Sequence, residues 1–122
     1  MKKFLILLFV VLLLDMLYIS FISKTFQKMI ENIQKTRFKI NYTSAVLCYI
    51  FIVIQLYVFI IKNNESIQKA FLLGFTTYGI YELTNLATIT QWNIPIAIMD
   101  TIWGGILYAL TSYITLLLLK LK

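Results

Sequence analysis

Three acidic residues lie inside runs that are otherwise apolar enough to cross a lipid bilayer: Asp15, Glu82 and Asp100. A carboxyl group is costly to bury in a membrane segment, so such residues usually mark an ion path, a proton path or a ligand site. The same runs contain no lysine, arginine or histidine, so these acids lack a fixed cationic partner. We therefore expect either that at least one acid is protonated or that a cation from outside completes the site.

The predicted helices place the three acids at one depth. Glu82 lies six residues before Thr88, Asp100 lies six residues after Ile94, and a short turn joins these two helix ends. Asp15 lies seven residues before the end of the first apolar run, which opens on the same side. At about 1.5 Å per helical residue, each carboxyl lies about 9 to 11 Å below one membrane face. The sequence thus predicts a shared acidic layer.

Helical spacing adds polar and aromatic neighbours to this layer. Residues three and four apart share a helix face, which groups Tyr78 with Glu82 and Asp100 with Trp103. Gly104 and Gly105 lack side-chain bulk and should let a neighbouring backbone approach closely. The candidate ligand- or ion-binding residues are Asp15, Tyr18, Tyr49, Tyr78, Tyr81, Glu82, Asn85, Asp100 and Trp103.

The composition excludes an ordinary soluble domain, because 61% of the 122 residues are hydrophobic and 13% are charged. The length allows a single domain over residues 1–122. The net charge is +6, and the basic residues lie between the apolar runs. This pattern favours contact with the lipid bilayer and its anionic headgroups, and we expect no nucleic-acid partner.

The numbers of cysteine and histidine residues limit the metals and cofactors that the chain could bind. The chain has one cysteine, Cys48, and no histidine, so no internal disulfide and no Cys/His metal site can form. Any metal would be a hard cation on oxygen ligands, and we expect no cofactor. Cys48 itself is interpreted as a packing residue, and Gln55 as an interhelical hydrogen-bonding residue.

The predicted fold class is all-α: an integral membrane bundle of four transmembrane helices with a short interfacial amphipathic helix after the first. Runs of suitable length lie at residues 4–22, 42–61, 70–88 and 94–119. The first run could instead be a cleaved signal peptide, but no small-residue cleavage site follows it, so we expect a retained helix. Both termini then share one side, where the basic residues number six against five on the other, and we expect them to be cytoplasmic.

The segment 23–41 is the most charged part of the chain, and it allows two interpretations. Its apolar residues recur at helical spacing, which predicts an amphipathic helix lying on anionic headgroups. The alternative is a solvated basic loop. Trp92, in the turn between the last two helices, is interpreted as an interfacial anchor that could also cap the acidic site.

Several motifs stand in order along the chain: Asp15-x-x-Tyr18, the octapeptide YELTNLAT at 81–88, Trp92, and Asp100-x-x-Trp103-Gly104. This series resembles a family of small predicted membrane proteins catalogued as domain of unknown function 2177. Two positions depart from the pattern, since Glu82 stands where the family more often shows Asp and Tyr18 where it often shows Trp. The resemblance implies four transmembrane helices and a retained first helix, and it brings no established activity.

The leading functional hypothesis is a membrane protein that binds a proton, a cation or a small polar ligand in the acidic layer, as part of a transporter-like unit. Four helices enclose little pathway alone, so we expect a homodimer. A second hypothesis is a membrane enzyme of lipid modification, whose acids would hold Mg²⁺ or act as general acid and base. The sequence has no nucleophile–base pair or phosphate loop, which favours a non-enzyme. A third is a structural membrane or virion-membrane component, in which the acids only tie helices together.

Overall fold

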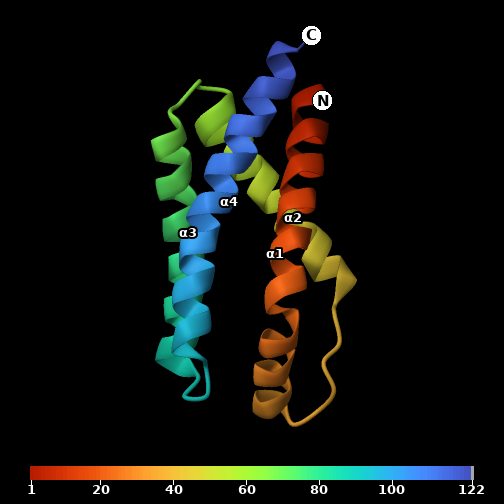
Figure 1. Ribbon diagram of the computed structural model, residues 1–122, viewed down its shortest axis with the longest axis vertical. Helices are drawn as coiled ribbons and strands as arrows, with labels where there is room; N and C mark the ends of the chain where they lie inside the picture. The colour runs from red at the N-terminus through yellow and green to blue at the C-terminus, as the bar shows by residue number, and fades with distance from the viewer. Residues whose placement is uncertain (122) are drawn as a thin grey trace.

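The computed structural model describes residues 1–121, and the regular elements in that part of the chain are all helical (Figure 1). This confirms the predicted all-α fold. The elements are α1 (Lys2–Gln34), α2 (Tyr42–Leu56), the π-helical continuation of α2 named η1 (Tyr57–Ile61), α3 (Ile67–Thr88) and α4 (Ile94–Lys120).

Local sequence signals account for the helix boundaries. Asn41, Ser66 and Asn93 each precede a helix, and each side chain accepts a hydrogen bond from the backbone N–H three residues further on. Such caps satisfy backbone donors that a helix start leaves unpaired. Pro95 follows in the first turn of α4, where its missing N–H costs nothing. At the other end of α1, Lys35 adopts the left-handed conformation, with φ 62°, and stops the helix.

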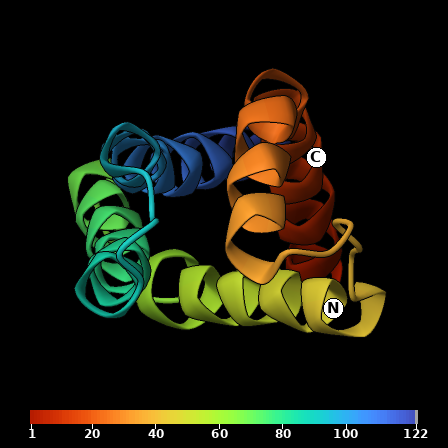
Figure 2. The same cartoon turned by 90° about the horizontal axis from the view of Figure 1, so that it is seen from below.

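The helices stand around a roughly square outline when seen along the bundle (Figure 2). α3 and α4 are antiparallel neighbours with the most extensive packing, α1 packs against α4, and α2 packs against α1. Both termini and the connection at 62–66 lie at one end, while the loop at 35–41 and the turn at 89–93 lie at the other (Figure 1). α2 crosses the bundle at a steep angle and has little contact with α3.

Two glycines let α3 and α4 approach closely. A Cβ atom on Gly74 would lie 2.1 Å from the backbone oxygen of Gly104, and a Cβ on Gly104 would lie 2.4 Å from the ring of Tyr78. Neither position can hold a side chain unless the two helices separate. The expectation that a neighbouring helix packs tightly at Gly104 is thus confirmed.

The expected amphipathic helix after the first span is present, but it is the last part of α1 and not a separate element. α1 runs without a break for 33 residues, because no glycine or proline interrupts it where the apolar run ends. The apolar face of this last part packs against the turn that joins α3 and α4, through Phe26, Met29 and Trp92. A solvated basic loop is found only after Gln34.

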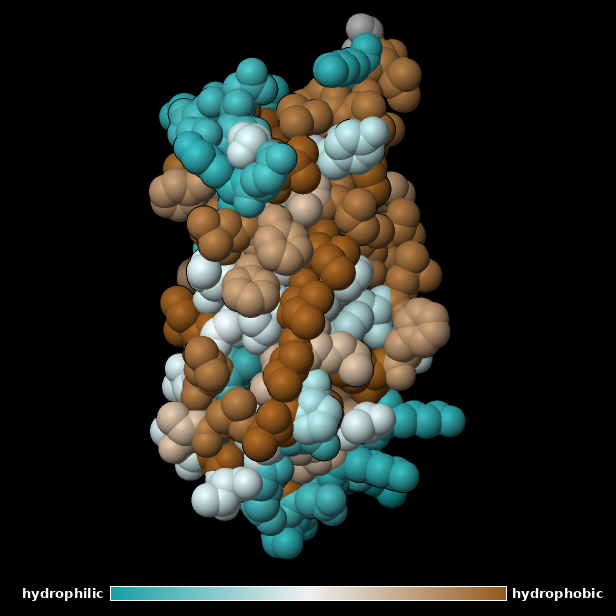
Figure 3. Space-filling view, turned by 60° about the vertical axis from the view of Figure 1, so that its left-hand side comes forward, coloured by the Kyte–Doolittle hydropathy of each residue, from teal (hydrophilic) through white to brown (hydrophobic). Residues whose placement is uncertain are grey.

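Three helical stretches of the described chain are long and apolar enough to cross a membrane: α1, α2 together with η1, and α4. α3, the fourth predicted span, is a helix of 22 residues that is not among them. It carries polar side chains along much of its length, Thr77, Glu82 and Asn85 included. Hydrophobic residues form a band between two hydrophilic ends of the molecule (Figure 3), as expected for a membrane protein.

Candidate functional site

Asp15 lies at the centre of a contact between three helices. Its carboxylate accepts a hydrogen bond from the indole N–H of Trp103 on α4, at 2.9 Å, and another from the hydroxyl of Tyr49 on α2. The side chain is 8% exposed. Asp15 therefore holds α1, α2 and α4 together at one level of the bundle, and it brings in Tyr49 and Trp103, two of the predicted site residues.

Asp100 receives the reciprocal bond from α1. The hydroxyl of Tyr18 donates to Asp100, while the rings of Tyr18 and Trp103 stack with centroids 4.7 Å apart and an interplanar angle of 5°. α1 and α4 run in opposite directions, and each carries an acid followed three residues later by an aromatic residue. This spacing sets each acid beside the aromatic residue of the other helix.

Glu82, on α3, is the most deeply buried of the three acids, with 1% of its surface exposed. The indole N–H of Trp92 donates to its Oε1 at 2.7 Å. Its Oε2 is also buried and has no donor among the described residues. The Glu82 carboxyl lies close to the carboxyl of Asp100. Two carboxyl groups can share a hydrogen bond only if one of them carries a proton.

Trp92 is a site residue that the predicted site did not include. It is 6% exposed, and edge-to-face contacts with Phe26 and Tyr81, with centroids 6.2 and 6.3 Å away, hold its ring in place. It caps the acidic layer from the turn, which was one of its two interpretations, and it does not lie free at an interface. Its position between two acid-bearing helices was the signal that could have identified it.

The donors to the three acids are all neutral groups, from Tyr18, Tyr49, Trp92 and Trp103. The acids form two groups: Asp15 alone, and the pair of Glu82 and Asp100. The stacked rings of Tyr18 and Trp103 connect the two groups. Within the described chain, no group of three or more acidic, histidine or cysteine side chains is close enough to hold a metal ion. The arrangement can therefore exchange a proton within the pair and can attract a positive charge to Asp15.

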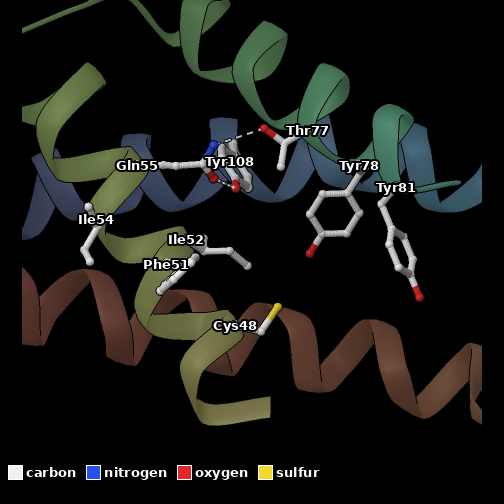
Figure 4. A pocket seen from close by; sticks show the side chains of 9 residues that line it. All are labelled: Cys48, Phe51, Ile52, Ile54, Gln55, Thr77, Tyr78, Tyr81 and Tyr108. Carbon is white, nitrogen blue, oxygen red and sulfur yellow. Dashed lines mark hydrogen bonds between the residues drawn. The ribbon is translucent and has the colours of Figure 1, made fainter. Parts of the chain in front are cut away.

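The other predicted site residues lie beside this centre. Tyr78 and Tyr81 project from α3 into a pocket of about 730 Å³ (Figure 4). Asn85 is half-buried, and its amide nitrogen has no partner in the described chain. These three side chains thus extend the candidate site from the acids towards the space between α2 and α3.

A second polar contact lies at the far side of the pocket. The Gln55 amide donates to the hydroxyl of Thr77 at 3.1 Å and accepts a hydrogen bond from the hydroxyl of Tyr108 (Figure 4). The prediction that Gln55 bonds between helices is confirmed. Thr77 and Tyr108 were not predicted, because neither is unusual in an apolar helix and only the packing brings them to Gln55.

Comparison with known proteins yields one family and no characterised relative. No curated protein and no solved structure is similar enough to this chain to count as a match. A family model described as "Predicted membrane protein (DUF2177)" matches residues 1–117, nearly the whole chain. Its description agrees with the apolar helices. The chain therefore belongs to the DUF2177 family of predicted membrane proteins.

Proposed function

We propose that this protein is a multi-pass membrane protein that takes up and releases a proton at the Glu82–Asp100 pair, as part of a transporter-like unit. One observation carries the proposal. Glu82 is buried, and its Oε2 has no donor in the described chain while its carboxyl lies close to that of Asp100. Two ionised carboxylates close together would repel each other strongly in a medium of low dielectric constant. A proton between them converts this repulsion into a hydrogen bond.

Among the ligands considered for the acidic layer, the geometry favours a proton over a metal ion. A hard cation prefers several oxygen ligands around it. The third carboxyl, Asp15, already accepts two hydrogen bonds, and it does not join the other two in a metal-binding group within the described residues. A proton needs only the two carboxyl groups that lie close together.

The test is infrared difference spectroscopy of the protein in lipid, which detects the carbonyl stretch of a protonated carboxyl. We expect a band that disappears at high pH in the wild type and is missing in Glu82→Gln and Asp100→Asn. Asp15→Asn is the matched control and should keep it. Thermal unfolding of each variant checks that it is folded. A wild-type spectrum with no protonated carboxyl at any pH at which the protein stays folded would refute the proposal.

A lipid-modifying enzyme is the second candidate, and the pocket supports it. The pocket is lined mostly by apolar and aromatic side chains and lies next to the acidic layer, an arrangement suited to a lipid chain beside general acid and base groups. Incubation with membrane lipids, with and without Mg²⁺, followed by mass spectrometry, distinguishes the two functions. A new lipid product that Glu82→Gln does not form would establish the enzyme.

A further inference from the structure

The pocket beside the acidic layer opens to the side of the bundle. It forms because α2 leans across α1 and barely contacts α3. Phe51 and Ile54 of α2 line it and are 67% and 44% exposed, so its outer rim belongs to the lateral surface. Both residues belong to Tyr42–Ile61, a stretch long and apolar enough to cross a membrane. The opening therefore faces the lipid.

The inner end of the pocket lies near Asp15, which is not itself a lining residue. Cys48 lines the pocket, and the next residue of α2, Tyr49, donates its hydroxyl hydrogen to Asp15. A molecule that enters from the lipid would thus have its inner end beside a carboxylate.

The charges around the pocket determine what can occupy it. Its nine lining residues include no acid and no base, and the charged groups of the adjoining layer are carboxyls. An anionic headgroup would be repelled there, whereas a cation would be attracted by the charge of the nearby Asp15 and by the rings of Tyr78 and Tyr81, since aromatic faces attract cations. The remaining lining is suited to hydrocarbon, and about 730 Å³ lies within the usual size of ligand pockets, roughly 300 to 1,000 Å³.

We infer that the pocket between α2 and α3 binds a cationic amphiphile from the bilayer, with its apolar chain along Phe51 and Ile54 and its amine head beside Asp15. The inference rests on the proposed function in one respect, since it takes the acidic layer to be a ligand site. It adds the class of ligand and the route of approach.

The single cysteine provides a probe for this pocket. Cys48 is exposed on the pocket wall, so a lipid-soluble maleimide can report its occupancy without an engineered label. The experiment measures the rate of Cys48 alkylation in phosphatidylcholine nanodiscs in the presence of three amphiphiles with the same chain: dodecyltrimethylammonium, dodecyl maltoside and dodecyl sulfate. We expect dodecyltrimethylammonium to slow alkylation several-fold more than the other two.

Two variants and one control position sharpen the test. Asp15→Asn should remove the preference for the cation, and Ile54→Trp, which fills the pocket mouth, should remove protection by all three amphiphiles. The control is Leu83→Cys in a Cys48→Ala background, because Leu83 is 66% exposed on α3 and does not line the pocket. Its alkylation should be the same with each amphiphile. Thermal unfolding checks the fold of each variant.

Equal protection of Cys48 by the three amphiphiles would overturn the assignment of a cationic head, and no protection by any of them would overturn the pocket as a ligand site. Unequal protection that is also seen at Leu83→Cys would overturn it too, since the effect would then belong to the bilayer. None of these outcomes depends on the infrared band of the Glu82–Asp100 pair. The amphiphile proposal can therefore fail while the proton proposal stands, and the reverse.

Discussion

The rings of Tyr18 and Trp103 stack 4.7 Å apart, and each side chain donates a hydrogen bond to the acid on the other's helix. This exchange fixes the register of α1 against α4, because sliding either helix by one turn would break both bonds and the stack at once. The acids therefore serve the packing as well as the proposed site. The predictions below separate these contributions.

Trp103→Phe keeps an aromatic ring against Tyr18 but removes the N–H donor to Asp15. We expect a loss of about 0.6 to 2 kcal/mol in the free energy of unfolding, the range for interhelical hydrogen bonds in membranes. Denaturant unfolding in detergent measures it. Tyr113→Phe is the control, because Tyr113 is 51% exposed on the same helix, and it should have no effect. Equal stabilities for the two variants would show that the Trp103–Asp15 bond contributes nothing.

Glu82→Gln should change how stability depends on pH. In the wild type, removal of the shared proton leaves two like charges close together, so the unfolding temperature should fall as the pH rises. Glutamine cannot ionise, and its amide can donate to Asp100. The variant should therefore lose this dependence and be at least as stable as the wild type at high pH. Parallel pH profiles for the two proteins would contradict this prediction.

Trp92→Phe should uncouple the 89–93 turn from the acidic pair. The variant keeps ring contacts with Phe26 and Tyr81 but leaves Glu82 Oε1 without its donor. We expect it to unfold more easily than the wild type, by about 1.5 to 3 kcal/mol, the usual range for a hydrogen bond to a charged group. In a Glu82→Gln background the cost should shrink, which a double-mutant cycle measures. Full additivity of the two substitutions would show that Trp92 acts only through packing.

Gly74→Ala should force α3 and α4 apart, since the added Cβ would lie 2.1 Å from a backbone oxygen of Gly104. Overpacking of this kind costs about 1 to 3 kcal/mol. Gly79→Ala is the matched control on the same helix, because its Cβ would meet only the methyl group of Thr101, at 3.4 Å. Alanine favours helices over glycine by up to about 1 kcal/mol, so this control should be neutral or stabilising. Similar losses in both variants would mean that the close approach at Gly74 is unimportant.

The sequence predicted that Tyr18, Tyr49 and Trp103 lie with the acids, but not which donor each acid faces. Hydropathy and helical rise suffice to place Asp15, Glu82 and Asp100 on three neighbouring helices, because both depend only on the position of each residue within its run. Which acid faces which donor depends on the rotation of each helix about its axis, and packing between side chains distant in the sequence sets that rotation. The exchange between Tyr18 and Trp103 is of this kind.

The pocket and the length of α1 could not be predicted for a related reason. The hydropathy of the chain changes sharply after Ile22, and this change predicts that a separate amphipathic helix begins there. The backbone has no reason to stop there, since Ser23 and the residues after it tolerate a helix. The lean of α2 across α1, which leaves little contact with α3, depends on packing between distant segments, about which composition says little.

α1 is one stiff rod of 33 residues, about 50 Å long at the usual helical rise. Its middle carries Asp15 and Tyr18, and Lys24 and Lys28 follow in its last third, outside the apolar run. Near the C-terminal end of α1, the sulfur of Met29 accepts a hydrogen bond from the backbone N–H of Asn93, which ties the helix to the turn at 89–93. Lys24 and Lys28 lie between this contact and Asp15, so a force on either lysine would pass along a stiff helix to its carboxyl-bearing middle.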